Sequence, residues 1–174
     1  MFFLKPFTPE EERRVRTSVC ALGDVEDDCE DWGHLFIWHG YIFQDGKEHF
    51  IEDLRDLFER CDPFSPFYDE QAAGAYRLGS YPHNFVAADD KVLDPEQPKV
   101  WLASTLDFSG EDTADQLGWT YGRLDAKESS IIFVNLDIAN MGPEECLDEG
   151  TVDQLWLSDL TAYREEDWPR VREE

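Results

Sequence analysis

The sequence predicts an α+β fold in a single domain, in which a mostly antiparallel sheet packs against about three to four helices. The 174 residues are enough for one domain, and 41% of them are hydrophobic. Twelve Phe, six Trp and six Tyr supply large apolar side chains that a disordered acidic chain would lack. We therefore expect residues 1–174 to fold as one acidic unit, with an acidic C-terminal segment from about residue 143.

Four segments have the apolar spacing of amphipathic helices. The clearest covers residues 9–22, where Thr8 and a glutamate three positions later form a capping box and proline occupies the first helical position. Val15 and Val19 lie four residues apart on its apolar side. Further helices are predicted over residues 51–61, 66–78 and 152–163.

Five segments have strand character, namely residues 34–43, 85–86, 100–108, 117–124 and 131–138. The aromatic and aliphatic run 34–43 predicts a buried strand with a bulge at Gly40, and the Asp-Gly pair that follows suits a hairpin turn. Residues 117–124 also fit a helical spacing, but Trp119 and Thr120 favour a strand. The apolar run 131–138 predicts a central strand.

The net charge excludes several classes of partner. Forty acidic and 15 basic residues give a formal charge of −25, whereas a protein that binds nucleic acid or an anionic membrane must present Lys and Arg. No run of 18 apolar residues is present, and the apolar start of the chain is too short for a signal-peptide core. Four scattered cysteines without a C-x-x-C pair predict reduced thiols, so we expect a cytoplasmic protein.

The amount of charge is comparable to that of DNA. A compact chain of this length has a diameter of about 40 Å, and the same length of duplex carries about 24 phosphates. The charge is also uneven, because residues 1–23 sum to +1 whereas residues 141–168 sum to −8. A second dense acidic stretch covers residues 24–31 and predicts a solvated loop.

These two stretches supply the candidate partner-binding residues, which are acidic apart from one tryptophan. They are Asp24, Glu26, Asp27, Asp28, Glu30, Asp31, Trp32, Glu144, Glu145, Asp148, Glu149, Asp153, Asp159, Glu165, Glu166 and Asp167. Trp32, Trp156 and Trp168 stand beside the acids, where tryptophan is favoured in the energetic centres of interfaces, although core packing is the alternative for each.

In size, charge and lack of catalytic motifs the chain is similar to small acidic inhibitors. These include immunity proteins that cap nuclease toxins and phage proteins that block restriction or CRISPR effectors by imitating DNA. The expected function is inhibition of a basic protein, a nuclease or another nucleic-acid-binding effector, by occlusion of its basic surface. Acids gathered on one face favour this interpretation, whereas acids spread evenly favour the acidic surface of a halophile protein.

A small intracellular enzyme that uses carboxylates, with or without a metal, is the other alternative. No G-x-S-x-G, P-loop or G-x-G-x-x-G motif is present, although Asp137 ends an apolar run as metal-binding acids often do. Ser104 and Ser109 lie near Asp107, with no histidine close in the sequence. The histidines at 34 and 39 would point to opposite faces of a strand, so the sequence predicts no metal site and no cofactor.

Overall fold

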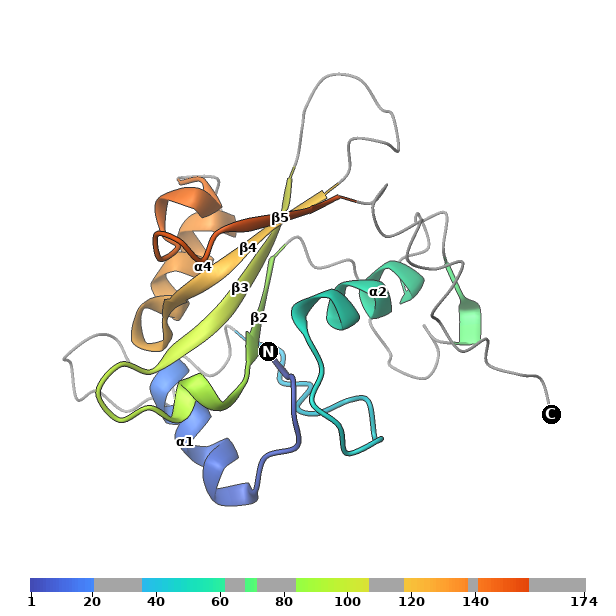
Figure 1. The fold of residues 1–174 in the computed structure, drawn as a ribbon, viewed down its shortest axis with the longest axis horizontal. Helices are drawn as coiled ribbons and strands as arrows, with labels where there is room; N and C mark the ends of the chain where they lie inside the picture. The colour runs from blue at the N-terminus through green and yellow to red at the C-terminus, as the bar shows by residue number, and fades with distance from the viewer. Residues whose placement is uncertain (21–35, 62–67, 72–83, 107–117, 138–140, 157–174) are drawn as a thin grey trace.

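A computed structural model of the chain describes residues 1–20, 36–61, 68–71, 84–106, 118–137 and 141–156. Five strands form one sheet in the order β1-β2-β3-β4-β5 (Figure 1). The strands are β1 (Phe2–Phe3), β2 (Asn84–Ala88), β3 (Lys99–Leu106), β4 (Gly118–Asp125) and β5 (Asp153–Trp156). Within the described ranges the α-helices are α1 (Pro9–Cys20), α2 (Ile51–Cys61) and α4 (Ser129–Asp137), and the 3-10 helices are η3 (Asp90–Leu93), η5 (Ala126–Glu128) and η6 (Pro143–Glu145).

The sheet is mixed but mostly antiparallel, which confirms the predicted α+β fold. Only the β1–β2 pair is parallel, and the other three neighbouring pairs are antiparallel. β3 and β4 pair along their full lengths, from Lys99 opposite Asp125 to Leu106 opposite Gly118. None of the helices in the described residues is long and apolar enough to cross a membrane.

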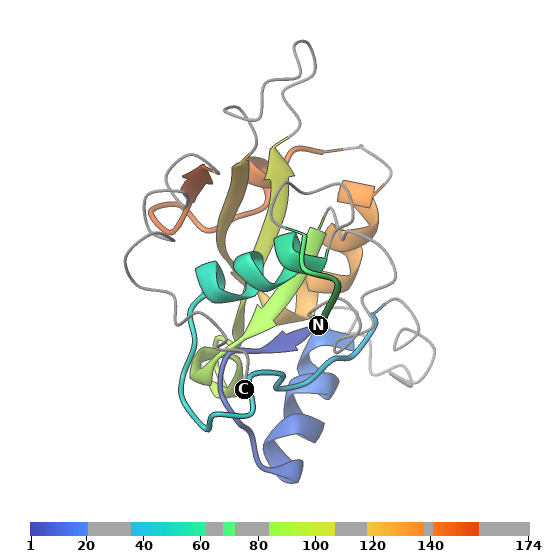
Figure 2. The same ribbon diagram turned by 90° about the vertical axis from the view of Figure 1, so that its right-hand side faces the viewer.

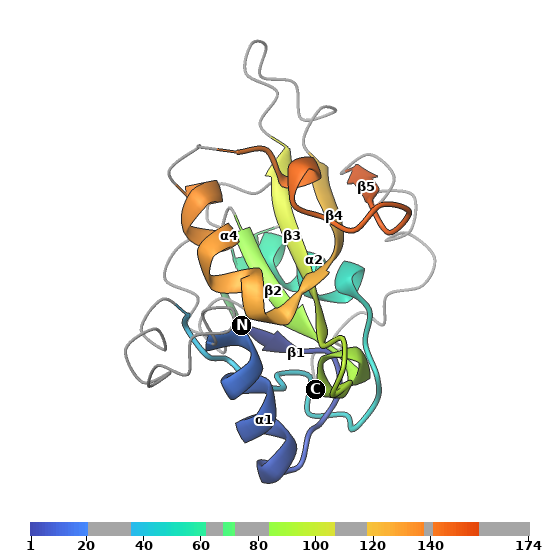
Figure 3. The same cartoon turned by 90° about the vertical axis from the view of Figure 1, so that its left-hand side faces the viewer.

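Helices cover both faces of the sheet, and each face has its own apolar core. Figure 3 shows α1 and α4 on one face, where Val15 and Ile132 join Leu102 and Leu124 of the central strands in one buried cluster. The sheet thus forms a middle layer, because every second residue of a strand points to the same face.

Among the described helices, α2 covers the opposite face, as Figure 2 shows. Leu54 and Phe58 of α2 pack there with Phe85, Ala103 and Trp119 of the sheet. Neighbouring residues of one strand therefore belong to different cores. In β3, for example, Leu102 lies in the core under α1 and α4, and Ala103 lies in the core under α2.

The first two predicted helices are confirmed. At the start of α1 the Thr8 backbone N–H and hydroxyl donate to the Glu11 carboxylate at 2.7 and 2.8 Å, and the Glu11 N–H donates to the Thr8 hydroxyl. Val15 and Val19 are fully buried on the predicted side. α2 has the predicted bounds, with Leu54 and Phe58 four residues apart in its core-facing side. The predicted strands at 85–86, 100–108 and 117–124 correspond to β2, β3 and β4 over their described parts, while residues 107–108 and 117 lie outside the described residues, as do 21–22 of the first predicted helix.

The predicted buried strand 34–43 is wrong for its described part, residues 36–43. Gly40 forms a single parallel bridge with Phe2 and has a φ of +66°, a left-handed conformation that interrupts an extended chain. The segment instead packs rings against neighbours, with Phe36 near Phe133, while Ile37 is 74% exposed. The following Asp-Gly turn therefore joins no hairpin, because no ladder precedes it.

The predicted central strand 131–138 is also wrong, since residues 129–137 form α4. A continuous apolar run does not distinguish a buried strand from a buried helix by its period. Two serine hydroxyls that precede the run fix the helix start, because Ser130 donates to the Val19 carbonyl at 2.6 Å and Ser129 to the Ala126 carbonyl at 2.6 Å. Ile132 then faces the core, and Ile131 is 53% exposed on the other side of the helix.

The predicted closing helix 152–163 is wrong where it is described, because Asp153–Trp156 form β5. These residues pair with the edge of β4, from Asp153 opposite Tyr121 to Trp156 opposite Gly118, so strand pairing overrides the helical spacing. Residues 157–163 lie outside the described residues, as do the loop 24–31 and the predicted helix 66–78 apart from 68–71.

Thr120 provides a test of the burial of β4. It is 2% exposed, and among the described residues its hydroxyl has no hydrogen-bond partner. A buried hydroxyl without a partner costs about 1–3 kcal/mol, so we expect Thr120→Val to raise the free energy of unfolding by about 1 kcal/mol in urea denaturation. Ser104, whose hydroxyl donates to Asn84 at 2.6 Å, is the matched control, and Ser104→Ala should lower stability. A loss of stability in Thr120→Val would contradict the burial described.

Candidate functional site

Five of the sixteen predicted partner-binding residues fall in the described structure. They are Glu144, Glu145, Asp148, Glu149 and Asp153, all in the segment 141–156 that follows α4. The other eleven, Asp24, Glu26, Asp27, Asp28, Glu30, Asp31, Trp32, Asp159, Glu165, Glu166 and Asp167, lie outside the described residues. The side chain of Trp156 and the whole of Trp168 lie outside them as well.

The acidic segment 141–156 is anchored to β4 by an apolar side chain and by backbone contacts. Leu147 is 8% exposed and packs over Gly122, where its Cδ1 would stand 3.0 Å from any added Cβ. The backbone of Arg123, the next residue in β4, makes two further contacts with the segment. Its carbonyl accepts from the Asp148 N–H at 2.7 Å, and its N–H donates to the Thr151 hydroxyl at 2.9 Å. The segment therefore holds its carboxylates in a defined place beside the sheet.

Two of the five acids stabilise the segment itself. The Glu145 carboxylate accepts from the Gly142 N–H at 2.8 Å at the start of η6, and Asp148 pairs with Lys99 at 3.1 Å. Glu144 and Glu149 are exposed and form no ion pair with any described residue. These last two are therefore available to a partner without loss of an internal contact.

The fifth acid, Asp153, lies beside an acid of α2 that the sequence did not single out. The Tyr121 hydroxyl is 3.3 Å from Oδ2 of Asp153 and 3.3 Å from Oε1 of Glu52. Burial and the two carboxylate charges raise the pKa of Tyr121 above its usual range, so the phenol keeps its proton and donates it. One tyrosine of β4 thus joins the acids of α2 to those of β5.

The acids around α2 were missed because they are spread along the sequence. Asp45, Glu48, Glu52 and Asp53 stand among apolar residues of the loop and helix, with no local run of acids to mark them. Glu59 of the same helix is buried and accepts from Nε of Arg55 at 2.9 Å, so it belongs to the core. Only the fold, through Tyr121, shows that Glu52 extends the predicted surface.

The described charges are divided unequally between two parts of the molecule. We define the α1 end as residues 1–20, 89–99 and 123–128, which surround α1 in Figure 1. Contacts join its parts, including Lys5 with Asp90 at 2.5 Å and the Arg14 guanidinium with the Leu93 carbonyl at 2.9 Å. The α1 end holds nine acids and eight bases, a net charge of −1.

We group all other described residues as the α2–β5 side, which also contains α4 and the loop 36–50. It holds 14 acids and three bases, a net charge of −11. Two of those bases, Arg55 and Arg60, lie in α2, and Arg55 is buried in an ion pair with Glu59. The described molecule is therefore electrically polar, with nearly all of its excess negative charge on the side that carries α2, β5 and the segment between α4 and β5.

The bases of the α1 end are largely used within the fold. Arg123 makes a two-pronged ion pair with Asp89, with one N···O distance of 2.8 Å, and its guanidinium lies 3.9 Å from the Trp101 ring. The Trp101 Nε1–H also donates to Asp89 at 3.1 Å. Burial raises the pKa of Asp89, but the bonds and charge of Arg123 outweigh it, so the pKa lies below its usual value.

An open hollow of about 250 Å³ lies beside this ion pair, lined by Lys91, Asp94, Gln97, Lys99 and Arg123. Two of its three cations are already neutralised, Arg123 by Asp89 and Lys99 by Asp148. The hollow therefore offers an anion little net positive charge, and we assign it no ligand.

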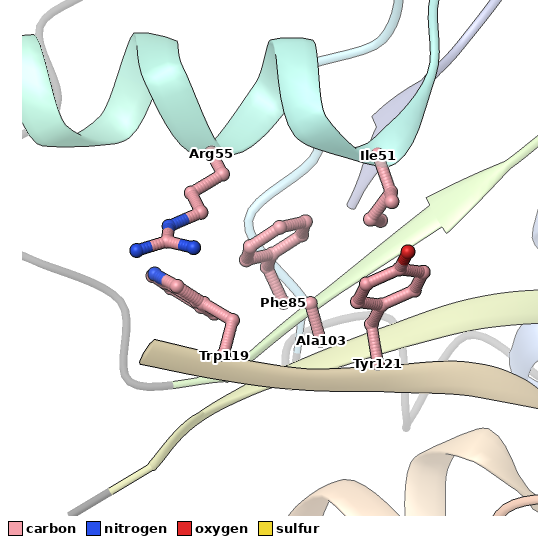
Figure 4. Close-up of a pocket in the computed structure, with 6 residues that line it drawn as sticks. All are labelled: Ile51, Arg55, Phe85, Ala103, Trp119 and Tyr121. Carbon is pink, nitrogen blue, oxygen red and sulfur yellow. The ribbon is translucent and has the colours of Figure 1, made fainter. Parts of the chain in front are cut away.

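The cavity between α2 and the sheet is too small for a ligand. Figure 4 shows Arg55 above Trp119, with Ile51 and Tyr121 at the other end of the cavity and Phe85 between them. Its volume is about 10 Å³, near the lower limit for one water molecule, and its lining offers no polar surface. The Arg55 guanidinium lies 5.9 Å from the Trp119 ring, so this site is a packed core contact.

Two described side chains of types that often serve in catalysis, Ser104 and His39, are engaged in structural contacts. The hydroxyl of Ser104 is buried and donates to Asn84, and His39 stacks on Phe2 with ring centroids 4.4 Å apart. Burial lowers the pKa of His39, and the amino-terminal charge adds to this effect. Within the described ranges no three His, Cys, Asp or Glu side chains are placed to hold a metal ion, and Asp137 has no described side chain.

Comparison of the chain with protein-family models, with curated proteins and with solved structures finds no match. The charge distribution and the contacts of the described residues are thus the basis for a functional proposal.

The Asp89–Arg123 pair gives a test of how the α1 end is held together. We expect Arg123→Met, which keeps contact with Trp101 but removes the charge, to lower the free energy of unfolding by about 2–4 kcal/mol near pH 7. The folded pKa of Asp89 is depressed, so the stability from this pair is present above about pH 4 and is lost as the pH falls.

Urea denaturation across pH checks this expectation. The difference between wild type and Arg123→Met should narrow as the pH falls from about 7 to about 3, because protonated Asp89 no longer needs its partner. Lys127→Met changes an exposed base of the same end and serves as the control, with an expected effect of less than about 0.5 kcal/mol. A difference that is independent of pH would contradict the assigned role of Asp89.

Proposed function

We propose that this protein binds the basic, nucleic-acid-handling surface of a partner protein and inhibits the partner by occlusion. The observation that supports this most directly is the charge polarity, with −11 on the α2–β5 side against −1 at the α1 end. An acidic surface that served solubility alone would not need to be concentrated on one side. A polar distribution, by contrast, orients the molecule as it approaches a positively charged partner.

The contacts of the acidic side fit this role. Glu48, Glu144 and Glu149 are exposed, and their carboxylates are in no ion pair with a described residue, so a partner's Lys or Arg can approach them. Glu52 and Asp153 each lie 3.3 Å from the Tyr121 hydroxyl, which donates its single proton to one of them at a time, so the two acids stand close together on this side. Association driven by such a surface is fast and weakens as salt is added.

The class of partner follows from the chemistry of the surface. A nuclease toxin or another effector that grips nucleic acid exposes Lys and Arg at the site where phosphates bind. Carboxylates placed over that site would exclude the nucleic acid by charge and by bulk. The proposal therefore covers immunity proteins and phage inhibitors of restriction or CRISPR effectors, which share this mode of action.

Capture from a lysate of the native host tests the proposal. The immobilised protein should retain a basic protein at about 50 mM salt and release it at about 0.5 M, since the Debye length falls steeply over this range. The captured protein should then lose nuclease or nucleic-acid-binding activity when the inhibitor is added. Retention of no basic protein at low salt would overturn the proposal.

Two charge-matched triple variants locate the contact. Glu48→Gln/Glu144→Gln/Glu149→Gln changes the acidic side, and Glu12→Gln/Glu96→Gln/Glu128→Gln makes the same chemical change at the α1 end. At low salt we expect the first to slow association with the captured partner by about threefold to tenfold, and the second by less than about twofold. Equal effects of the two triples would contradict an oriented contact.

A further inference from the structure

The side chain of His49 lies between two carboxylates from different segments. Its Nε2 is 2.9 Å from Oδ2 of Asp45 in the preceding loop, and its Nδ1 is 3.1 Å from Oδ2 of Asp53 in α2. The ring stacks on Phe43 with centroids 3.5 Å apart, and the His49 N–H donates to the Leu4 carbonyl at 2.6 Å. The ring is thus fixed with each nitrogen directed at a carboxylate oxygen.

Each of the two acids is also held within its own segment. Asp45 accepts from the Tyr41 hydroxyl and from the Lys47 N–H, the latter at 3.0 Å, which closes the loop on itself. Asp53 accepts from the Phe50 N–H at 3.0 Å at the start of α2. The ring therefore adds a polar link between the closed loop and the first turn of the helix, beside Ile42 and Phe43, which pack against the α2 core.

The protonation state of the ring decides whether that link is complete. A neutral imidazole has one N–H and one lone pair, whereas an imidazolium has two N–H groups. Only the imidazolium donates to Asp45 and Asp53 at once. After loss of one proton, one carboxylate faces a ring lone pair and is repelled, so the ring bonds to one segment alone.

We propose that Asp45, His49 and Asp53 form a proton-dependent latch, which joins residues 44–48 of the loop to the start of α2 while the ring is doubly protonated and releases them when it is not. Loss of the proton leaves the fold intact and frees the loop that carries Glu48. The latch is independent of the proposed function, because it depends only on contacts within the chain.

The groups around the ring are consistent with a single controlling proton. They are Tyr41, Asp45, Lys47 and Glu48 of the same loop, Glu52 and Asp53 of α2, and Lys5 of the N-terminal segment, which interacts with the charge of Glu48. Burial and the hydrogen bond to Asp45 raise the pKa of Tyr41 to about 12. The Tyr41 hydroxyl and the His49 ring hold the pKa of Asp45 well below its usual range. Neither group therefore titrates between about pH 5 and 9.

NMR spectroscopy of the full chain tests the latch. The ring nitrogens of His49 are followed from about pH 5 to 9 together with the backbone amides of residues 44–50 and of the first turn of α2. We expect the loop amides, the α2 amides and the ring to change with one common midpoint. The wild-type chain should be more stable to urea below that midpoint than above it, because one charge-assisted hydrogen bond is lost with the proton.

Two variants and an internal control make the test specific. His49→Gln cannot donate in both directions, so its loop and α2 amides should lose the pH-dependent change, and Asp45→Asn should uncouple the loop from the ring titration. His39, which stacks on Phe2, is the control, because its own titration should leave the first turn of α2 unmoved. Loop and α2 amides that do not follow the His49 ring would overturn the proposal.

Discussion

Forty carboxylates in a chain of 174 residues repel one another, and this repulsion constrains how the remaining parts of the molecule are arranged. Only 15 bases are available to offset it. At the α1 end nine described acids stand against eight bases, and ion pairs join Lys5 with Asp90 and Arg123 with Asp89. That end of the fold therefore carries little excess charge, while the excess negative charge of the described residues lies on the α2–β5 side.

The sheet allows this separation because its two faces bury two different apolar clusters. α1 and α4 cover one face, and α2 covers the other, so the core does not depend on any of the exposed acids. Tyr121 shows how the two requirements meet in one residue. Its ring lies beside the α2 core, and its hydroxyl lies between Glu52 and Asp153 at the surface. Core packing thus positions part of the acidic surface.

Local signals in the sequence predicted the elements that local contacts define. The capping box at Thr8 and the spacing of Val15 and Val19 predict α1, and the strand character of residues 100–108 predicts β3. The errors arise where distant contacts decide. Residues 36–43 meet β1 at a single bridge and join no ladder. α4 starts at two serines whose hydroxyls donate to the carbonyls of Val19 and Ala126. β5 forms because the edge of β4 is available for pairing.

The candidate surface was predicted in part for the same reason. The acids of 144–153 are dense enough to be noticed in the sequence, whereas Glu48 and Glu52 are separated by apolar residues of the loop and of α2. The Tyr121 hydroxyl lies close to both Glu52 of α2 and Asp153 of β5, and this proximity cannot be predicted from the order of residues along the chain. The roles of Glu145 and Asp148 as internal anchors likewise follow only from their hydrogen bonds.

This charge distribution makes the surface potential of the α2–β5 side more negative than that of the α1 end. Amide-proton relaxation in the presence of a cationic and then an anionic paramagnetic co-solute measures that potential residue by residue, with no partner required. The cationic probe should be enriched around α2 and residues 141–154 and much less around α1 and η3, and the ratio should fall with added salt. Equal enrichment around α1 and α2 would contradict the claim.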